Sequence, residues 1–406
     1  MDKLKLAVFG AWRGNSYVDI FLKHPKIELI AICDKNIANL ENKDNADLKD
    51  VALFTEFDEF LAFCKEKKVN AMYLANYFHQ HAPFAIRAME AGMDVMSECT
   101  AASTMKECVE LVEAVERTGR KYLLAENYPF MAANIEIKKI IDGGTLGALQ
   151  YAEGEYNHTG DNAELARLTP GNYHWRAWLP RTYYITHTLG PVMYLTNSMP
   201  KYVCGRAAHS PLLYEMKDFR RNYDGVGMVF CEMDNGMIAR VTGCTAMGSD
   251  YSRYRFCGEN GGAEMGGYIG DGNVRVFYHE HTKPEDRKDK DACYTYQVDP
   301  KSAYGEEEYE AAIKTGHGGG DYGMVQKMVD CFLYGKPSAF DVYKSVAMSA
   351  VAILGWRSAL NHGENMKIPD FRIKEERDAV RNDDLTPFPD ENGEGRTLPP
   401  ATKYPF

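Results

Sequence analysis

The segment LKLAVFGAWRGN, residues 4–15, decides the fold of the first part of the chain. It opens with a mostly apolar run that predicts a buried strand, and Gly10 ends this run. A stretch compatible with a helix follows at residues 15–24, and a second apolar run, ELIAIC at residues 28–33, ends at Asp34. A strand, a glycine turn, a helix and a strand closed by an acid are, in this order, typical of a dinucleotide-binding α/β unit.

The same alternation continues over the first part of the chain. Short apolar runs that predict strands alternate with patterns that predict helices, which implies right-handed crossovers and a parallel sheet. The predicted strands are residues 71–75, 94–97 and 121–125, and the predicted helices are residues 57–67, 83–91 and 104–118. We place the end of this first domain at residue 127.

The second part has longer strands in which apolar and polar residues alternate. Turns rich in glycine and asparagine separate neighbours, which favours an antiparallel or mixed sheet. The predicted strands are residues 150–155, 227–231, 237–241, 253–256 and 274–277, and the predicted helices are residues 322–334 and 343–361. The predicted fold class is therefore α/β, with an N-terminal Rossmann dinucleotide-binding domain at residues 1–127. A C-terminal α+β domain with a large mixed or antiparallel sheet follows at residues 128–380, and its last helices can pack on the first domain. Residues 381–406 form an extended proline-rich tail.

Composition excludes several classes of protein. The chain has 406 residues, 45% of them hydrophobic and 26% charged, with a formal net charge of -11. A net acidic surface argues against nucleic-acid and anionic-membrane binding. No apolar run approaches the roughly 18 residues of a membrane helix, and the N-terminus does not resemble a signal peptide. Ten cysteines without a C-x-x-C pair indicate reduced core thiols, so we expect a cytoplasmic protein.

The glycine turn after the first strand is the candidate nucleotide site. Glycines allow backbone amides to approach a pyrophosphate, and a carboxylate at the end of the second strand can accept ribose hydroxyls and repel the extra phosphate of NADP. The complete G-x-G-x-x-G pattern is absent, so a plain strand-to-helix turn remains the alternative. NAD is the expected cofactor. The candidate contacts in this segment are Gly10, Ala11, Trp12, Arg13, Gly14 and Asp34.

Further segments resemble the Gfo/Idh/MocA family of oxidoreductases. NYFHQH at residues 76–81 and the stretch AMEAGMDVMSE at residues 88–98 are similar to a nucleotide-contacting region of that family. The resemblance implies that Asn76, His81, Glu98 and Asn127 contact the cofactor, with His81 at the nicotinamide ribose. Most members continue the glutamate into an E-K-P motif, but here Cys99 stands in place of the lysine that helps to move a substrate proton.

Within that family, the sequence resembles the branch of NAD-dependent α-N-acetylgalactosaminidases, which also lacks the lysine. The segments that carry this resemblance are SECTAAST at 97–104, AENY at 125–128, GEYNH at 154–158, YITHTLGPV at 184–192 and GHGG at 316–319. The resemblance implies hydrolysis without net redox change. The sugar is oxidised at C3, the C1 substituent is eliminated after loss of the C2 proton, water adds, and the ketone is reduced again.

The proton transfers of such a route need groups that titrate near neutrality or a phenol held by a neighbour. His187 and Tyr184 are the catalytic candidates, and they would share a face if their segment were helical. Each has a structural alternative, because most tyrosines and single histidines serve packing. The candidate substrate-binding residues are Tyr128, Tyr156, His158, Arg176, Trp178 and His317.

Three functions remain open from the sequence alone: an NAD-dependent enzyme that cleaves or oxidises a sugar or glycoside, a non-catalytic NAD-binding sensor, and an interaction protein whose tail wraps a partner. The favoured partners are a small carbohydrate and a second copy of the chain, in a dimer or tetramer. No metal site is expected, because HEH at residues 279–281 would alternate along a strand and place Glu280 on the opposite face.

Overall fold

The computed structural model divides the chain into two compact units, each built from three separate segments. Unit 1 comprises Met1–Glu126, Asp321–Ser349 and Phe371–Asp384, and unit 2 comprises Asn127–Gly320, Ala350–Asp370 and Leu385–Phe406. The structure describes residues 3–40, 48–158, 167–169, 171, 173–215, 221–243, 246, 248–267 and 272–403. The units are discontinuous, whereas the domains expected from the sequence are contiguous; the division at residues 127 and 380 stays a prediction.

Unit 1 contains a six-stranded sheet in the order β3-β2-β1-β4-β5-β6. Its strands are β1 (Leu4–Phe9), β2 (Ile27–Cys33), β3 (Ala52–Phe54), β4 (Ala71–Leu74), β5 (Asp94–Ser97) and β6 (Tyr122–Leu124). Every neighbouring pair is parallel, which confirms the predicted parallel sheet. Strand β3 was not predicted from the sequence, since a strand of three residues is too short to show a periodic pattern.

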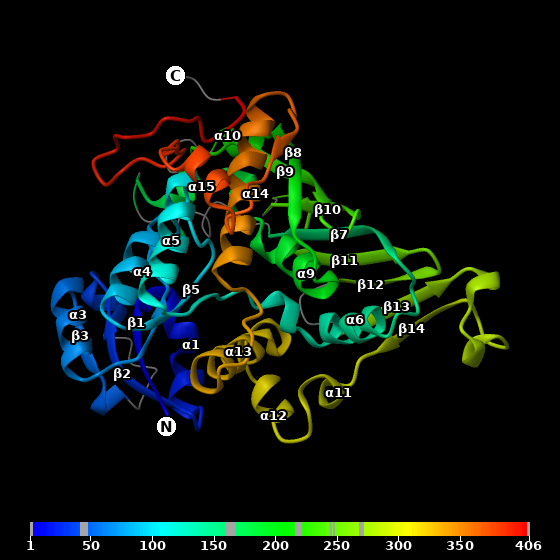
Figure 1. Cartoon of the computed structure of the whole chain (residues 1–406), viewed down its shortest axis with the longest axis horizontal. Helices are drawn as coiled ribbons and strands as arrows, with labels where there is room; N and C mark the ends of the chain where they lie inside the picture. The colour runs from blue at the N-terminus through cyan, green and yellow to red at the C-terminus, as the bar shows by residue number, and fades with distance from the viewer. Residues whose placement is uncertain are drawn as a thin grey trace. The chain divides into compact units, whose positions relative to one another are not determined.

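Most helices of unit 1 lie between successive strands of this sheet, and the others come from the two later segments of the unit (Figure 1). They are α1 (Ala11–Lys23), α2 (Ile37–Leu40), α3 (Phe57–Glu66), α4 (His81–Glu90), α5 (Met105–Thr118), α13 (Gly320–Tyr334, whose first residue belongs to unit 2), the first part of α14 (Val342–Leu360) and α15 (Lys374–Val380). Thr104 begins α5 with a capping box, since its side chain accepts from the Glu107 amide and the Glu107 carboxylate accepts from the Thr104 amide.

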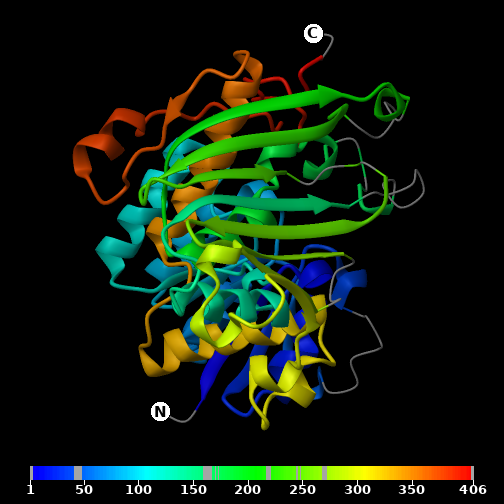
Figure 2. The same cartoon turned by 90° about the vertical axis from the view of Figure 1, so that its right-hand side faces the viewer.

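Unit 2 contains a nine-stranded sheet in the order β14-β13-β12-β11-β7-β10-β9-β8-β15, which Figure 2 shows with its strands side by side. The strands are β7 (Leu149–Asn157), β8 (Pro200–His209), β9 (Asp224–Met233), β10 (Ile238–Thr242), β11 (Tyr251–Gly258), β12 (Gly261–Gly267), β13 (Asn273–Tyr278), β14 (Cys293–Gln297) and β15 (Met366–Lys367). Strands β7 and β10 pair in parallel, and the other pairs are antiparallel. The predicted mixed sheet is therefore confirmed.

The helices of unit 2 include α6 (Ala132–Asp142), α8 (Trp175–Trp178), α9 (Thr186–Thr196), α10 (Pro211–Tyr214), α11 (Pro300–Tyr304), α12 (Tyr309–Ala312) and the last part of α14. Helix α9 packs directly on strand β7 at Gly154, where an added Cβ would lie 2.5 Å from the Thr188 carbonyl oxygen. A glycine at this point of β7 therefore lets the backbone of α9 approach the sheet.

The histidines at residues 279–281 do not lie on a strand, so this expectation was wrong. Glu280–Thr282 forms a 3₁₀ turn after β13, and the rings of His279 and His281 stack with their centroids 5.4 Å apart. Glu280 pairs with Lys283 at 2.7 Å. Among the described residues, no group of three or more histidine, cysteine or acidic side chains is arranged to hold a metal ion.

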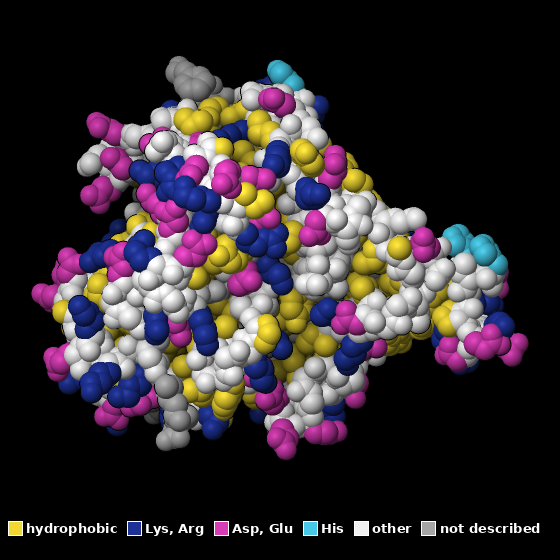
Figure 3. All heavy atoms as spheres, viewed as in Figure 1, with side chains coloured by type: hydrophobic (Ala, Val, Ile, Leu, Met, Phe, Trp, Pro, Cys, Tyr) yellow, Lys and Arg dark blue, Asp and Glu magenta, His cyan; other side chains and the backbone are white. Residues whose placement is uncertain are grey.

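The nine cysteines in the described residues form no disulfide, and Cys244 lies outside those residues. Most of the nine are buried, but Cys293 is exposed, so the expectation that all are core thiols was too broad. In the described part of the chain, every helix is too short or too polar to cross a bilayer. Acidic and basic side chains are interspersed on the face shown in Figure 3, where no large block of one charge stands out.

Candidate functional site

The first candidate site lies where the parallel strands of unit 1 end. Gly10, Asp34, Asn76, Glu98 and Glu126 each follow a strand within two residues of its last position. Because the carboxyl ends of parallel strands meet at one edge of the sheet, these residues share that edge. The strand order reverses between β1 and β4, which is the position where open α/β sheets bind ligands.

Gly10 and Asn76 meet at this reversal point and fit a dinucleotide. Gly10 has a φ of 99°, and an added Cβ would lie 2.3–2.4 Å from backbone atoms of Ala75 and Asn76, so only glycine can close this turn. Both polar atoms of the Asn76 amide are buried, and neither has a hydrogen-bond partner among the residues that the structure describes. A buried amide without a partner is unfavourable unless a ligand satisfies it, so this side chain is fit for a cofactor contact.

The Asp34 carboxylate caps helix α1. One oxygen accepts from the backbone amides of Ala11 (2.7 Å) and Trp12 (3.3 Å), and the other accepts from the Asn36 amide (2.8 Å) and the Asn39 side chain (3.1 Å). Helix α1 therefore begins at residue 11 rather than at residue 15 as predicted. The carboxylate already has four donors from the chain, so ribose hydroxyls would share or replace these contacts. The predicted ribose contact stays a prediction.

The earlier start of α1 places Trp12, Arg13 and Gly14 in the first turns of a helix and not in an open loop. Trp12 is 52% exposed. Gly14 allows helix and strand to pack closely, because an added Cβ would lie 2.8 Å from the Val8 side chain. These residues can flank a cofactor, but the Trp12 amide already donates to Asp34 and the Gly14 amide to the Gly10 carbonyl (3.0 Å).

Arg13 and Glu98, both predicted cofactor contacts, bind each other. Arg13 Nε donates to Glu98 Oε1 at 2.8 Å, and the same oxygen accepts from the Tyr73 hydroxyl at 2.9 Å. Arg13 also donates to the Tyr17 hydroxyl, which in turn donates to Asp321 at 3.1 Å. Burial raises the pKa values of Tyr17 and Tyr73, so both phenols remain protonated donors. This hydrogen-bond network stabilises the carboxyl ends of the strands within unit 1.

His81 also has partners within the chain. Its Nδ1 lies 2.8 Å from the Thr100 carbonyl oxygen and its Nε2 lies 3.2 Å from the Asn76 carbonyl oxygen. Burial lowers its pKa, so the neutral ring donates one hydrogen bond, and the shorter distance favours Nδ1 as the donor. The ring is thus held against the backbone, and a contact with the nicotinamide ribose would require it to leave one of these carbonyls.

Sequence reasoning missed Glu126. This residue is 0% exposed, and its carboxylate accepts from the thiol of Cys99, with the sulfur 3.5 Å from Oε2. Cys99 is the residue that stands in place of the lysine. The signal in the sequence was the position of Glu126 directly after a predicted strand, at the same sheet edge as the other candidates. A carboxylate beside the position of the missing lysine can hold or move a proton there.

The second candidate site is a group of four rings in unit 2, here called the aromatic cluster: Tyr128, Tyr156, Tyr184 and His187. The His187 ring lies 4.3 Å from that of Tyr128, 5.2 Å from that of Tyr156 and 5.3 Å from that of Tyr184. Tyr156 also lies 5.6 Å from Tyr128 and 6.2 Å from Tyr184. The imidazole is therefore in contact with three phenol rings, which brings both catalytic candidates together with two of the substrate-binding candidates.

Several elements position this cluster. Tyr128 begins the 3₁₀ turn η3 (Tyr128–Phe130), Tyr156 lies near the end of β7, and His187 lies in the first turn of α9. Tyr184 lies before α9 begins, so the two catalytic candidates do not share a helical face as the sequence suggested. The Tyr254 hydroxyl donates to the backbone carbonyl of His187 and fixes the start of α9 against β11.

His317 borders the cluster, with its ring 5.6 Å from that of Tyr128. Its loop has positive φ angles at three successive residues, His317, Gly318 and Gly319. The hydroxyl of Tyr304 is 2.8 Å from the Gly318 carbonyl and 2.9 Å from the Phe130 carbonyl. Tyr304 therefore holds the loop of His317 and the turn of Tyr128 at once.

The other predicted substrate residues lie around this group. The Arg176 guanidinium lies 6.0 Å from the Tyr184 ring, and His158 has its ring 6.0 Å from Tyr156 and its Nδ1 3.2 Å from Asp250. Trp178 is 7% exposed and packs under other arginines. Asn127, a predicted cofactor contact, is 1% exposed at the start of unit 2.

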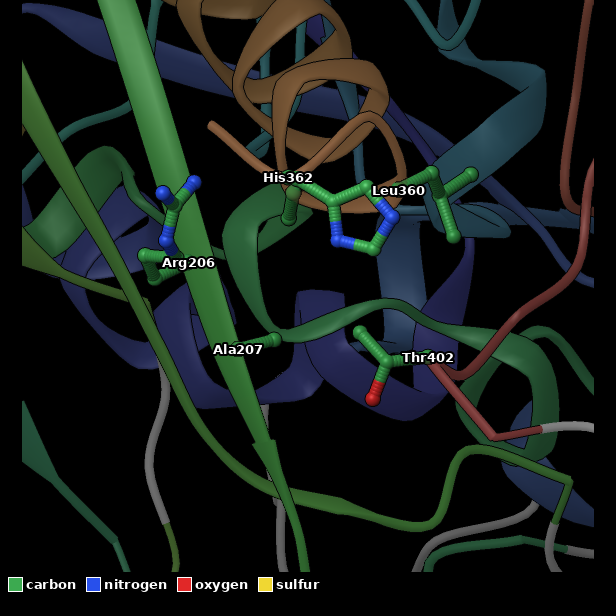
Figure 4. Close-up of a pocket in the computed structure, with 6 residues that line it drawn as sticks. Arg206, Ala207, Leu360, His362 and Thr402 are labelled. Atoms are coloured by element: carbon green, nitrogen blue, oxygen red, sulfur yellow. The ribbon is translucent and has the colours of Figure 1, made fainter. Parts of the chain in front are cut away.

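A pocket of about 280 Å³ lies in unit 2 (Figure 4). It is lined by Arg206, Ala207, Ala359, Leu360, His362 and Thr402. The Thr402 hydroxyl points away from the His362 ring and donates to the buried Asp224 carboxylate at 2.6 Å, an interaction that anchors the C-terminal segment. This pocket shares no residue with either candidate site.

Two family models match separate parts of this chain. Residues 4–126 match the family model of the oxidoreductase family, NAD-binding Rossmann fold (Gfo/Idh/MocA), and residues 254–375 match that of the glycosyl hydrolase 109 C-terminal domain. A glycosyl hydrolase family 109 protein 1 from Shewanella sp. (strain MR-7) is 28% identical over 91% of this chain and 85% of its own length. A glycosyl hydrolase family 109 protein from Shewanella baltica is 26% identical over the same shares.

Solved structures show the same fold. An Agrobacterium radiobacter oxidoreductase in complex with NAD+, L-tartaric acid and magnesium aligns with a TM-score of 0.68 at 13% identity, over 90% of this chain and 98% of its own. The myo-inositol 2-dehydrogenase of Lactobacillus plantarum aligns with a TM-score of 0.66 at 16% identity, over 90% and 99%. Residues 4–126 are therefore similar to the NAD-binding Rossmann part of Gfo/Idh/MocA oxidoreductases, and residues 254–375 are similar to the C-terminal domain of glycosyl hydrolase 109 proteins.

Proposed function

We propose that this enzyme acts on a sugar or glycoside by exchanging a hydride at the sugar C3, and that it uses this exchange to cleave a glycosidic bond without net redox change. The observation that carries the proposal is the aromatic cluster, in which one imidazole contacts three phenols within 4.3–5.3 Å. Flat ring faces suit a sugar ring, and an imidazole beside phenols suits repeated proton transfer.

The cofactor has a place in unit 1. NAD, when bound, supplies the oxidation and the later reduction at C3. The residues present fit it: the Gly10 turn allows close backbone approach, and the buried Asn76 amide needs a partner. We propose that Asn76 binds the cofactor directly, and that Arg13, Glu98 and His81 act indirectly by keeping the strand ends in place through the hydrogen bonds described above.

The proton transfers fall to the cluster. Once C3 is a ketone, the C2 proton is acidified, and a base must remove it as the C1 substituent leaves. We assign this work to His187 and Tyr184, whose rings lie 5.3 Å apart, so that one group takes a proton from the sugar while the other gives a proton to a leaving oxygen. The Tyr254 contact with the His187 carbonyl keeps the imidazole in position.

The absence of the lysine at Cys99 supports cleavage over simple oxidation. A dehydrogenase that relies on that lysine needs its neutral amine to take the hydroxyl proton, but here the position holds a thiol that donates to Glu126. Proton handling in this enzyme therefore shifts to the cluster residues and to the Glu126 carboxylate.

The test is to incubate the full chain with nitrophenyl glycosides and free sugars, with and without NAD, and to follow phenolate release and NADH absorbance separately. Phenolate release without accumulation of NADH supports the cleavage route, and steady NADH production indicates a sugar dehydrogenase. If neither phenolate nor NADH forms and NAD still binds tightly, the protein is a sensor. His187→Ala should reduce the activity by about 10²–10⁴-fold, the range for a general acid or base. The matched control is His279→Ala, an exposed ring in the same unit, which should keep full activity. Full activity in His187→Ala would refute the site assignment.

A further inference from the structure

The catalytic candidate Tyr184 lies in a short irregular segment of the chain. The 3₁₀ turn η4 (Arg181–Tyr183) ends directly before it, and α9 begins at Thr186. With a φ of −95° and a ψ of 59°, Tyr184 has the geometry of neither element. Its position in the aromatic cluster therefore depends on how η4 is held in unit 2.

A phenylalanine from the C-terminal end of the chain packs on η4. The ring of Phe388 is 3% exposed and meets the fully buried ring of Tyr183 edge to face, with the two centroids 5.4 Å apart. Such a contact is favourable beyond the apolar area that it buries. Phe388 belongs to residues 385–403, drawn in red in Figure 1 and here called the C-terminal strap.

The C-terminal strap reaches η4 a second time through Asp224, the first residue of β9. The Asp224 carboxylate is fully buried and accepts from the Thr402 amide at 2.9 Å and from the Thr402 hydroxyl at 2.6 Å. The backbone carbonyl of Asp224 accepts from Nε of Arg181, at the start of η4. Because a buried carboxylate is costly without donors, Thr402 and Arg181 are coupled through this one residue.

The C-terminal strap is itself fixed in unit 2. It folds back on itself, since the Thr386 carbonyl accepts from the amides of Thr397 and Leu398 at 2.9 and 3.0 Å. The buried indole of Trp356 on α14 donates to the Pro399 carbonyl at 2.9 Å. These contacts lie on both sides of the folded part of the segment, so they keep it against η4.

We propose that the C-terminal strap positions Tyr184 for proton transfer, with Phe388 and Thr402 as the positioning residues. Phe388 acts through Tyr183, and Thr402 acts through Asp224 and Arg181. The inference rests on the proposed function, since it assigns how one of its two acid–base residues is held. A misplacement of about 1 Å at a reacting group costs about 100-fold in rate, so loss of this support should reduce turnover more than substrate binding.

The experiment compares the full-length wild type with Phe388→Ala, Phe388→Leu and Thr402→Val. Amide hydrogen exchange at residues 181–186, measured by mass spectrometry, reports the mobility of η4 and Tyr184. In Phe388→Ala this exchange should rise, and kcat should fall about 10- to 100-fold with little change in KM or in the Kd for NAD. Phe388→Leu should restore most of kcat, because a large apolar side chain still fills the space beside Tyr183. Thr402→Val, which loses only the hydroxyl contact, should show the same changes to a smaller extent and carries the test if Phe388→Ala does not fold.

The matched control is Asp390→Ala in the same strap. The Asp390 side chain accepts from the amides of Asn392 and Glu394 at the exposed tip, so its loss should change neither kcat nor the exchange at residues 181–186. The inference is overturned if the exchange or kcat of Phe388→Ala equals that of the wild type, if only KM changes, or if Asp390→Ala has the same effect. A wild type that turns over neither sugars nor glycosides refutes the proposed function and with it the positioning role, whereas equal turnover in the wild type and Phe388→Ala refutes the positioning role alone.

Discussion

Replacing Gly10 by alanine should abolish tight NAD binding while unit 1 stays folded. Two costs add at this position. A non-glycine residue at a φ of 99° is strained by about 1–2 kcal/mol. The new Cβ would also lie 2.3–2.4 Å from backbone atoms of Ala75 and Asn76, whereas ordinary contact begins at 3.4 Å, so the two backbones must separate by about 1 Å.

A displacement of this size acts on the cofactor site itself, because Asn76 follows β4 at the reversal of strand order. The hydrogen bonds that the turn and the Asn76 amide make to a dinucleotide would be stretched beyond useful length. Loss of a single charge-assisted hydrogen bond costs about 1.5–3 kcal/mol, which corresponds to an increase of about 10- to 150-fold in the Kd for NAD.

The assay is titration of NADH fluorescence or calorimetry with NAD, together with thermal unfolding. The matched control is Gly92→Ala: Gly92 has a similar φ of 92°, but an added Cβ meets nothing within 4 Å. It should lose about the same stability from strain and keep the wild-type Kd. If Gly10→Ala binds NAD within twofold of the wild type, the turn is not the cofactor cradle and the reasoning fails.

Two further predictions concern positioning and pH. Tyr304→Phe removes the hydroxyl that holds both the Phe130 and Gly318 carbonyls, so kcat should fall about tenfold with little change in KM. The control is Tyr309→Phe, whose hydroxyl contacts Glu310 and whose loss should leave kcat and KM unchanged. An equal fall of kcat in both variants contradicts the positioning role of Tyr304. Burial, with lesser effects of nearby positive groups, lowers the pKa of His79 to about 4. The unfolded chain, with a pKa near 6.5, therefore takes up a proton that the folded chain does not, so the stability is complete above pH 6.5 and should fall by about 2 kcal/mol at pH 5. Urea unfolding at pH 7.5 and 5 measures this loss, which His79→Gln should reduce; an unchanged loss would assign it to other groups.

The two sheets could be predicted because their patterns are local. The apolar run at residues 4–9 predicts a strand buried on both faces of its sheet. The alternation at residues 227–231 predicts a strand buried on one face only. Each pattern can be recognised within a few residues. The start of α1 could not be predicted in this way. It depends on the Asp34 carboxylate, which lies 23 positions after Ala11 in the chain. A capping residue so distant in sequence does not change the pattern of apolar residues near the start of the helix.

The candidate site shows the same limit. His187 and Tyr184 were found through their segment, and they were expected to share a face only if that segment were helical; Tyr184 lies before α9, so this condition does not hold. The rings of Tyr128 and Tyr156 reach His187 from a 3₁₀ turn and from β7, and only the tertiary fold brings these segments together. Glu126 escaped for a related reason: its importance comes from burial and from the Cys99 thiol, and neither is visible in the sequence.

The position of Asp34 shows how one residue can serve the fold and the choice of cofactor together. Its carboxylate is fully engaged with four donors, so its effect on the cofactor does not depend on a direct hydrogen bond to the ribose. A negative charge at the end of β2 repels the additional phosphate of NADP from this position, whatever donors hold the carboxylate. The cap on α1 fixes that charge in place. We therefore expect the carboxylate that starts helix α1 early also to favour NAD over NADP, because the cap holds it at the end of β2.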